Sequence, residues 1–366
     1  MKKNTKNCLI FKNFLKNNPK FNFFLVTKPE NIFWLTGFFG SFGFFLQTKK
    51  SGFLVTDSRY AEFAKKITKK LGLEFLLFDK DLKKNLEKFL PKEQKTCAIE
   101  DSIPIAKFKN LKKYFKKTKF IPQSNVIENL RQIKTDDEIK KIKKAQSQVD
   151  KILLPFFQQY IKKNITEKKA AFILEQMIRD QGEFELSFPP IVAFGKNSAI
   201  PHHQPTNQKI NKNENILIDC GAKYQGYCSD ITRNFYFGTP SSEFINKFEI
   251  LKKAQNQTLK KFIPGESYKN TEKFCRKILG EDANFFTHSL GHGVGLEIHE
   301  LPYVSSKEKK DCGKNFQPNQ VVTCEPGIYF PEKFGIRIED LVWIKKDGNK
   351  ILSRTNKNLY IKCRGL

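Results

Sequence analysis

The sequence lacks several features that define common protein classes. Its 366 residues contain no apolar run of 18 or more, so we expect no transmembrane span and no membrane partner. The basic N-terminus is not followed by an apolar stretch of signal-peptide length, because Lys16-Asn17-Asn18 interrupts the chain soon after Phe14 and Leu15. None of the eight cysteines forms a C-x-x-C pair, which disfavours a zinc ribbon or a thioredoxin-like motif. These absences predict a cytoplasmic protein with free thiols.

Acidic residues are few compared with basic ones. The chain has 66 Lys and Arg against 38 Asp and Glu, and its formal net charge is +28. Such an excess is typical of nucleic-acid-binding proteins. However, the Lys residues are spread along the whole chain, and Lys, Asn and Phe are abundant together, as AT-rich codon usage favours. We interpret the charge as a solvated surface that attracts polyanions only weakly, and we expect no specific nucleic-acid partner.

The length exceeds that of a usual single core, so two domains are expected. Strand and helix patterns alternate in residues 1–128, which predicts a small α/β domain. The predicted strands are Phe21–Val26, Ile32–Leu35, Gly43–Leu46, Gly52–Val55, Glu74–Phe78 and Thr96–Ile99. The predicted helices are Ser58–Leu71, capped by Asp57, and Asp81–Phe89.

Residues 129–366 predict a larger α+β domain. Apolar residues recur at helical spacing from Ile139 to Tyr160, and a second helix is expected from the N-cap Thr166 to Gly182. Further predicted helices cover Glu243–Phe262 and Tyr268–Leu279. The predicted β-rich segments are Ile191–Phe194, Asn215–Phe237, Val321–Phe330 and Gly335–Lys345.

Histidine is scarce, and its placement is informative. The chain has only five histidines, and all of them fall between residues 202 and 299. They stand in stretches interrupted by Gly or Pro and not on amphipathic helix faces: His202, His203, His288, His292 and His299. A single histidine is usually structural, but five in one predicted domain beside unusual acids indicate a functional site.

The first unusual acid, Asp219, closes an apolar strand. Asp230 follows eleven residues later, after a turn sequence that ends in Gly226. A two-residue loop at Tyr224 and Gln225 would place the two aspartates directly opposite each other, with Cβ atoms about 4.5–5.5 Å apart. Two carboxylates at so short a distance repel each other unless a proton or a cation lies between them. The pair therefore predicts a divalent metal. Two exposed hairpin acids are the simpler alternative.

A second acidic pair has the same arrangement. Glu325 ends one predicted strand and Glu339 begins the next, and a loop centred on Glu332 would bring the two carboxylates face to face. We expect Arg337 and Thr232 to hydrogen-bond the acids of the site. Arg337 would also offset negative charge there, and its simpler interpretation is an ordinary strand residue.

His292 adds an imidazole to the four acids. It lies between Gly291 and Gly293, where the backbone can approach a site closely. The combined donor set is hard and rich in oxygen, which suits two manganese, cobalt, iron or zinc ions and disfavours copper(I) or an iron–sulfur cluster. Four carboxylate charges balance two divalent ions. A hydroxide bridging the ions would be a strong nucleophile at neutral pH.

The five predicted ligands resemble, in order and in local motif, those of the pita-bread metallopeptidases: Asp219, Asp230, His292, Glu325 and Glu339. The short gap between the two glutamates resembles that of the Xaa-Pro branch, which contains aminopeptidase P and prolidase. The sequences of the stretches Leu186–His203 and Ile32–Tyr60 also resemble that branch. The resemblance implies a pita-bread catalytic domain in residues 129–366 and a creatinase-N-like domain in residues 1–128. It also implies a homodimer and two metal ions, with manganese expected first.

The resemblance implies roles for individual residues. Glu325 would bind metal and act as the general base, while the bridging hydroxide attacks the carbonyl of the bond before proline. His202, His288 and His299 match positions that contact the substrate. His203 has no matching role, and we interpret it as structural.

Three functions remain open. The first is an Xaa-Pro aminopeptidase, which removes the N-terminal residue from proline-containing peptides of varied length. The second is an Xaa-Pro dipeptidase, or prolidase, which accepts only dipeptides. The third is a non-catalytic basic protein that binds polyanions on a peptidase fold. The complete ligand set argues against the third function, whereas nothing in the sequence separates the first two.

Overall fold

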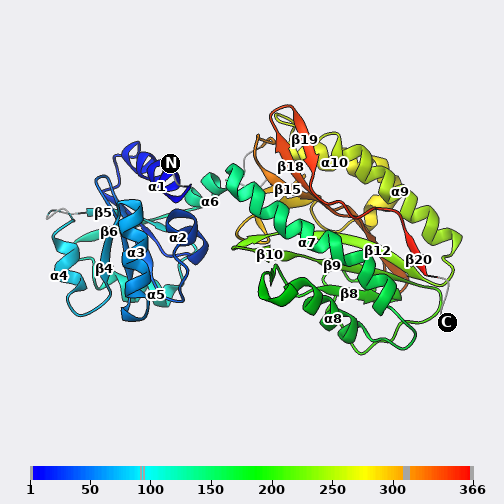
Figure 1. The fold of residues 1–366 in the computed structure, drawn as a ribbon. Coiled ribbons are helices and arrows are strands. Elements are labelled where there is room, and N and C mark those ends of the chain that lie inside the picture. The colour runs from blue at the N-terminus through cyan, green and yellow to red at the C-terminus, as the bar shows by residue number, and fades with distance from the viewer. Residues whose placement is uncertain (1–2, 91–92, 94, 308–313, 363–366) are drawn as a thin grey trace. The chain divides into compact units, whose positions relative to one another are not determined.

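The computed structural model describes residues 3–90, 93, 95–307 and 314–362 (Figure 1). The chain divides into two compact units, Met1–Arg131 and Gln132–Leu366. The last element of the N-terminal unit is helix α6, Val126–Arg131, so the expected boundary after residue 128 lies inside this helix.

The N-terminal unit is a six-stranded mixed sheet with helices on both faces (Figure 1). Its strands lie in the order β4-β3-β2-β1-β5-β6, and β1 pairs antiparallel with β2 and parallel with β5. The strands are β1 (Phe23–Val26), β2 (Phe44–Thr48), β3 (Gly52–Thr56), β4 (Glu74–Leu77), β5 (Lys95–Glu100) and β6 (Thr118–Gln123). The other helices are α1 (Lys3–Lys16), α2 (Pro29–Thr36), η1 (Ser58–Tyr60), α3 (Ala61–Leu71), α4 (Leu82–Glu87) and α5 (Ile105–Lys112).

Apolar side chains on both faces of strand β1 hold this unit together. Phe23 and Leu25 belong to a buried cluster that includes Leu86 of α4. Phe24 contacts Phe11 of α1 instead, with ring centroids 5.1 Å apart. Successive side chains of a strand point to opposite faces, so an unbroken apolar run buries both faces of the sheet.

The prediction of a strand at Ile32–Leu35 is wrong, because these residues lie in helix α2. Pro29 occupies the first turn of this helix, and Gly37 ends it in the left-handed conformation, with φ of 76°. A short apolar run does not distinguish a strand from a buried helix, and here the flanking Pro and Gly decide. Helix α1 is absent from the predicted elements, although its buried residues Phe11 and Leu15 have helical spacing.

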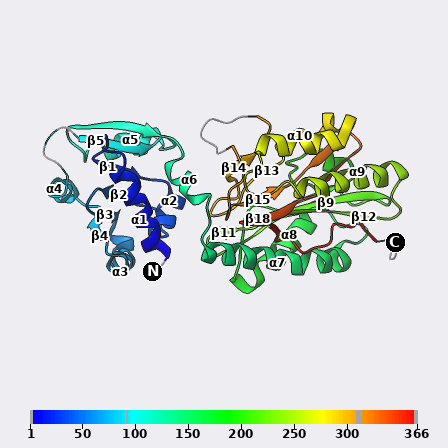
Figure 2. The same cartoon turned by 90° about the horizontal axis from the view of Figure 1, so that it is seen from above.

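The C-terminal unit consists of β-sheets enclosed between two pairs of helices (Figure 2). Helices α7 (Asp136–Tyr160) and α8 (Glu167–Arg179) pack against strands β8, β9 and β12. Helices α9 (Ser242–Leu259) and α10 (Tyr268–Leu279) pack on the opposite side, against strands β15 to β18. Short helical turns are η2 (Asp180–Gly182), η3 (Gly195–Ala199) and η4 (Gly280–Phe285).

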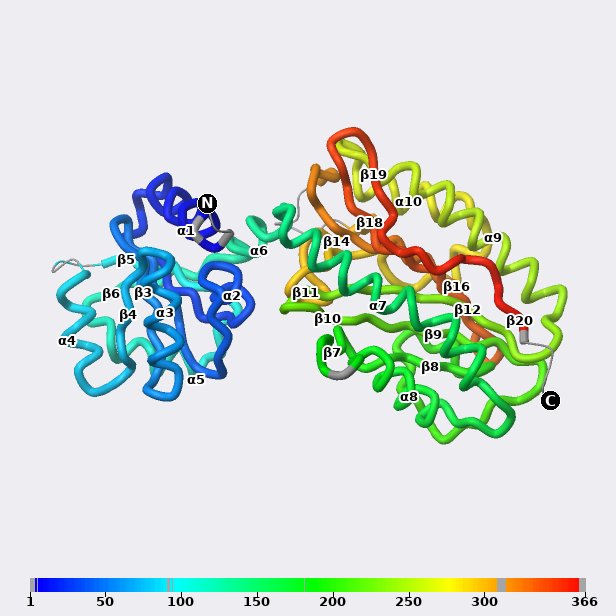
Figure 3. The backbone as a smooth tube through the Cα atoms, viewed as in Figure 1, coloured from blue at the N-terminus to red at the C-terminus, as the bar shows by residue number. Residues whose placement is uncertain are grey.

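Two larger sheets form the interior of this unit, in the orders β20-β12-β9-β8 and β14-β13-β15-β18-β19. Smaller sheets have the orders β11-β10-β7 and β16-β17. Strand β20 returns to lie parallel beside β12 (Figure 3). The strands are β7 (Glu185–Leu186), β8 (Ile191–Phe194), β9 (Glu214–Cys220), β10 (Ala222–Tyr224), β11 (Tyr227–Cys228), β12 (Ile231–Phe237), β13 (Gly291–Gly293), β14 (Glu300–Val304), β15 (Val321–Cys324), β16 (Gly327–Phe330), β17 (Phe334–Arg337), β18 (Asp340–Lys345), β19 (Gly348–Ile351) and β20 (Tyr360–Lys362).

The register predicted for the first acidic hairpin is wrong. Strands β9 and β12 pair so that Asp219 faces Thr232 and not Asp230. The loop consists of Gln225 and Gly226, whose φ angles are 46° and 86°. A two-residue turn of this kind needs positive φ at both positions, and glycine adopts it without strain. With this turn the cross-strand partner of Asp219 is Thr232, two positions beyond the predicted Asp230.

The register predicted for the second acidic hairpin is confirmed. The residue before Glu325 pairs with the residue after Glu339 in the β15–β18 ladder. Strands β16 and β17 continue the same register on the other side of the two acids. The loop residue Glu332 has φ of 57°. Glu325 and Glu339 therefore lie opposite each other, between the β15–β18 ladder and the β16–β17 ladder.

Two predictions drawn from absences can be compared with the described residues. The cysteines described there are buried and free, as predicted: Cys8, Cys97, Cys220, Cys228, Cys275 and Cys324. Cys312 and Cys363 lie outside the described residues. None of the helices in the described ranges combines the length and the apolar character that a membrane crossing requires.

Helix α7 begins with reciprocal side-chain caps. Glu138 Oε2 accepts hydrogen bonds from Thr135 N at 2.7 Å and from Thr135 Oγ1 at 2.9 Å. Thr135 Oγ1 in turn accepts from Glu138 N at 3.4 Å. Tyr227 donates its hydroxyl proton to Glu138 Oε1 at 2.8 Å, so the cap also ties the helix to β11.

Replacing the capping threonine should therefore weaken the C-terminal unit. We expect Thr135→Ala to lower its free energy of unfolding by about 1 kcal/mol, the usual cost of losing an N-cap side chain. Urea unfolding followed by circular dichroism measures this change. Lys140→Ala, on an exposed position of the same helix, is the matched control and should leave the midpoint unchanged. Equal midpoints for Thr135→Ala and the control would contradict the capping argument.

Candidate active site

A cavity of about 390 Å³ lies in the C-terminal unit. Nine of the ten residues predicted for the site line it: His202, Asp219, Asp230, His288, His292, His299, Glu325, Arg337 and Glu339. The tenth, Thr232, donates a hydrogen bond from Oγ1 to Glu339 Oε2 at 2.7 Å, so it contacts a lining carboxylate. The structure therefore brings the whole predicted set together.

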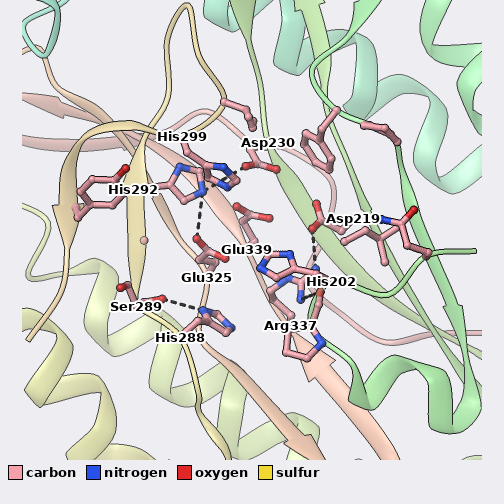
Figure 4. A pocket seen from close by; sticks show the side chains of 18 residues that line it. His202, Asp219, Asp230, His288, Ser289, His292, His299, Glu325, Arg337 and Glu339 are labelled. Atoms are coloured by element: carbon pink, nitrogen blue, oxygen red, sulfur yellow. Dashed lines mark hydrogen bonds and ion pairs between the residues drawn. The ribbon is translucent and has the colours of Figure 1, made fainter. Parts of the chain in front are cut away.

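The five predicted ligands come from central segments of two sheets (Figure 4). Asp219 lies near the end of β9, and Asp230 lies in the short segment before β12. His292 lies in β13. Glu325 directly follows β15, and Glu339 directly precedes β18. Because β9 pairs with β12 while β13, β15 and β18 share a sheet, segments far apart in sequence meet here.

His292 makes the closest contacts among the predicted ligands. Its Nε2 lies 3.2 Å from Glu325 Oε1 and 3.6 Å from Asp230 Oδ2. Donor atoms of Asp230, His292 and Glu339 all lie within 4.8 Å of one another. The His292 Nδ1–H donates to Gly293 O at 3.1 Å. In the protonated ring the Nε2–H faces Glu325, and once that proton leaves, Nε2 carries the lone pair that a metal binds.

The buried charge of the site fits divalent cations. Asp219 Oδ1 is buried and has no hydrogen-bond partner in the part of the chain that the structure describes. Burial first, and then repulsion from neighbouring carboxylates, raise the pKa of Asp230 and the pKa of Glu339 well above their ordinary values. Cations among these oxygens would satisfy the unpaired atom and remove the repulsion. Carboxylate oxygens together with one imidazole nitrogen are also ligands that suit manganese-like ions.

Glu325 differs electrostatically from the other acids. Burial alone would raise its pKa, but the hydrogen bond and the charge of His292 lower the pKa to about 2. The same hydrogen bond raises the pKa of His292 against the opposing effect of burial. Thr323 Oγ1 supports both groups, because it lies 3.2 Å from Glu325 Oε1 and accepts from His292 N at 3.0 Å. Glu325 is therefore ionised at neutral pH.

Arg337 connects both acidic hairpins. Its Nη2 donates to Asp219 Oδ2 at 2.6 Å, and its Nε donates to Thr232 Oγ1 at 3.0 Å. Its Nη1 donates to the Tyr329 hydroxyl at 2.8 Å and to Pro201 O at 3.3 Å. The guanidinium is buried, so each of these contacts is shielded from water.

His288 has both ring nitrogens engaged by the protein. Its Nδ1–H donates to Ser289 O at 2.9 Å, because a carbonyl can only accept. In the neutral ring Nε2 then accepts from the Tyr329 hydroxyl at 2.9 Å. Burial lowers the pKa of His288, which is consistent with a neutral ring. In this arrangement His288 contacts the cavity wall and offers no free nitrogen to a ligand.

His299 and His202 lie on opposite sides of the site (Figure 4). The His299 ring centroid is 4.3 Å from that of His292, at an interplanar angle of 76°. Although His299 is exposed in part, the burial of the rest of its ring, and then the charge of His292, lower its pKa to about 4, so the ring is neutral at physiological pH. His202 is exposed and lies on the side of Asp219 and Arg337.

Comparisons with known proteins agree with this geometry. Residues 140–346 match the model of metallopeptidase family M24, and residues 16–133 match the creatinase/prolidase N-terminal domain. The chain belongs to metallopeptidase family M24. The predicted resemblance, the pita-bread fold and the metallopeptidase class are thereby confirmed.

Several individual relatives of this M24 peptidase cover nearly all of it. It is 33% identical over 338 residues to the Xaa-Pro dipeptidase of Pyrococcus horikoshii, which covers 92% of this chain and 93% of that protein. The structure of the Xaa-Pro dipeptidase from Bacillus anthracis superposes with a TM-score of 0.90 at 30% identity, over 98% of this chain and 100% of that chain. The X-Pro aminopeptidase from Thermotoga maritima gives a TM-score of 0.83 at 34% identity, over 93% and 98%.

Two residues of this M24 site are absent from the predicted set, Thr323 and Tyr329. Thr323 contacts His292 and Glu325, and Tyr329 links Arg337 to His288. A signal for both was present in the sequence. Alternate residues of an extended segment lie on one face, so counting by twos from Glu325 leads to Thr323 in one direction and to Tyr329 in the other.

Neutralising one acid tests the electrostatic account of the site. Because the pKa of Asp230 is raised in the fold, its ionised form opposes folding at neutral pH, and Asp230→Asn removes this cost. In the presence of a chelator at pH 7.5, the variant should unfold at a higher temperature than the wild type. The difference should shrink as pH falls toward about 4, where an unperturbed Asp is half protonated.

Added Mn²⁺ should affect the unfolding temperatures of the two proteins differently. It should raise the unfolding temperature of the wild type and leave that of Asp230→Asn nearly unchanged, since a ligand is missing. Asp180→Asn, at an exposed position, is the matched control and should respond to Mn²⁺ like the wild type. An equal Mn²⁺ response in Asp230→Asn would remove Asp230 from the ligand set.

Proposed function

We propose that the protein is a metal-dependent exopeptidase that hydrolyses the peptide bond preceding proline. The observation that carries this proposal is the convergence of four carboxylates, two of them buried and two partly buried, and one imidazole on one cavity. Relatives named as Xaa-Pro dipeptidases and as an X-Pro aminopeptidase, all at 30% identity or more, support the substrate class. The complete donor set argues against a non-catalytic polyanion-binding role.

The residues proposed to hold two divalent ions are Asp219, Asp230, His292, Glu325 and Glu339. When bound, such ions lower the pKa of a coordinated water and polarise a carbonyl oxygen. Manganese is the ion we propose first, because hard oxygen donors dominate the set. Arg337 and Thr232 keep the carboxylates oriented through the hydrogen bonds to Asp219 and Glu339.

The protein groups around the reacting bond divide the remaining tasks. Glu325 lines the cavity, where we propose that its carboxylate accepts the proton of the attacking nucleophile. The neutral His299 can donate a hydrogen bond to the oxygen on which negative charge develops. His202, exposed on the other side, is placed to contact the peptide. A substrate contact by His288 would require exchange of its hydrogen bond with Tyr329.

The cavity also has an apolar wall that suits a proline ring. The residues Phe188, Pro189, Ile191, Ile298 and Tyr303 are among those that line it. A pyrrolidine ring has no amide hydrogen to donate and buries its methylene groups favourably against such side chains. A polar side chain at the same place would lose hydrogen bonds to water without replacement.

The length of the accepted peptide separates two forms of the proposed function. The aminopeptidase form, which we propose first, is supported by the Thermotoga maritima structure at 34% identity. The dipeptidase form is supported by the Pyrococcus horikoshii and Bacillus anthracis relatives. For both forms we further propose a homodimer in the cytoplasm, as expected from the family resemblance and from the composition.

Substrate length therefore provides a direct test. With Mn²⁺ present, the protein should hydrolyse Leu-Pro or Leu-Pro-Ala, and release of leucine measures both reactions. Leu-Ala and Leu-Ala-Ala are controls that should react at least about tenfold more slowly, because they do not fill the apolar wall. A dipeptidase cleaves only Leu-Pro, whereas an aminopeptidase cleaves the tripeptide as well. Absence of cleavage of both proline peptides would overturn the proposed function.

A second test concerns Glu325. Glu325→Gln keeps the size of the side chain and removes its charge, so it should lower the turnover number by about 10²–10⁴-fold, the range typical of a lost general base. Metal content by atomic emission should be measured on the same samples. Glu281→Gln, an exposed acid of the same unit, serves as control. Near-normal turnover in Glu325→Gln would exclude the base role.

A further inference from the structure

His203 differs from its neighbour His202 in exposure and in hydrogen bonding. His202 is exposed and lines the cavity, while His203 is buried, with 6% of its surface exposed, and does not line the cavity. The His203 Nε2–H donates to Glu167 Oε2 at 2.9 Å. The ring of His203 is therefore held by Glu167, and it belongs to the residue next to His202, a proposed substrate contact.

Glu167 is a fully buried carboxylate at the first turn of α8. Besides His203, it accepts hydrogen bonds from Phe194 N at 2.8 Å and from Asn197 Nδ2 at 2.9 Å. Thr206 donates to it twice, from N at 2.9 Å and from Oγ1 at 2.7 Å. Burial by itself raises the pKa of Glu167, but these hydrogen bonds, led by that of His203, lower it.

These five donors belong to one segment, residues 194–206, which runs from the end of β8 past His202. The segment is also held on its other side, because Arg337 Nη1 donates to Pro201 O at 3.3 Å and Gly335 N donates to Ser198 Oγ at 2.8 Å. Among the described residues His202 itself has no hydrogen-bond partner. Its orientation toward the cavity is therefore determined by the backbone on either side of it and not by hydrogen bonds of its own ring.

We propose that Glu167 and His203 form a positioning pair that holds His202 in the orientation in which it contacts the peptide. The effect on catalysis rests on the proposed function, whereas the effect on His202 does not. A bond between a buried carboxylate and an imidazole is short-ranged and directional, so it determines the backbone conformation at residue 203 closely. Because His202 is adjacent, a change there moves its ring within the cavity.

Two amides of different length test the proposal. Gln places its amide nitrogen near the position of His Nε2, whereas Asn places it near Nδ1, too short to reach Glu167. His203→Gln should keep kcat/KM for a proline peptide within about twofold of the wild type, and His203→Asn should lower it by about tenfold. Asn207→Leu, at an exposed position of the adjoining loop, is the control.

A double-mutant cycle separates positioning from a general loss of stability. In a His202→Ala background, His203→Asn should lower kcat/KM by no more than about twofold, because the group that it positions is absent. If His203→Asn lowers kcat/KM tenfold in both backgrounds, or in neither, the proposal is wrong. A purely structural pair would lower the unfolding temperature of His203→Asn without this dependence on His202.

A spectroscopic measurement makes the inference independent of catalysis. The chain has only five histidines, so the Cε1–H resonance of His202 can be assigned by its loss in His202→Ala. This resonance should shift or broaden in His203→Asn and remain in place in His203→Gln. An unmoved resonance in His203→Asn would overturn the positioning pair. If no proline peptide is cleaved at all, the proposed function fails, while this measurement still decides the role of Glu167 and His203.

Discussion

Repulsion among four carboxylates that share one cavity is the physical constraint on which the C-terminal unit depends. Two like charges about 4 Å apart repel by roughly 4 kcal/mol at an effective dielectric constant of 20. Domains are stable by only about 5–15 kcal/mol, so a cluster of four acids needs compensation built into the fold. The cluster consists of Asp219, Asp230, Glu325 and Glu339. Arg337 and His292 supply part of the compensation, and the raised pKa of Asp230 and of Glu339 shows that a deficit remains. Divalent cations are the means of removing that deficit without protonating the acids.

Two adjacent acids show how local contacts determine which carboxylates remain available. Asp340 is buried beside Glu339, yet its pKa is lowered, because Arg233 and Lys357 outweigh the effect of burial. Arg233 Nη2 donates to Asp340 Oδ1 at 2.7 Å, and Lys357 Nζ lies 2.8 Å from Asp340 Oδ2. The charge of Asp340 is thus balanced within the protein. Glu339 receives a hydrogen bond from the neutral Thr232 instead, and burial together with the neighbouring carboxylates keeps its pKa well above the ordinary value.

The sequence predicts the site better than it predicts the path of the chain, for reasons visible in particular residues. The register of the second hairpin is correct because one loop centre, Glu332, fits both ladders. The first register is wrong by two because alternation along a strand is unchanged by such a shift, and only the positive φ of Gln225 and Gly226 resolves it. Tertiary contacts such as those of Glu167 have no sequence pattern, because their partners lie 27 to 39 positions away.

The loops that bring His202 and His299 to the cavity are both held in place by a buried acid. Glu167 accepts hydrogen bonds from the segment that carries His202, and Glu300 directly follows His299 in the chain. Lys134 Nζ lies 2.8 Å from Glu300 Oε1, and both side chains are almost fully buried. A Cβ on Gly295 would come within 2.3 Å of that oxygen, so the loop closes over the carboxylate only because glycine is present. A buried carboxylate that makes several hydrogen bonds or ion pairs can move only if these contacts break together. The cavity histidines can therefore be exposed to ligands and still hold defined positions, which is what selective contact with a small peptide requires.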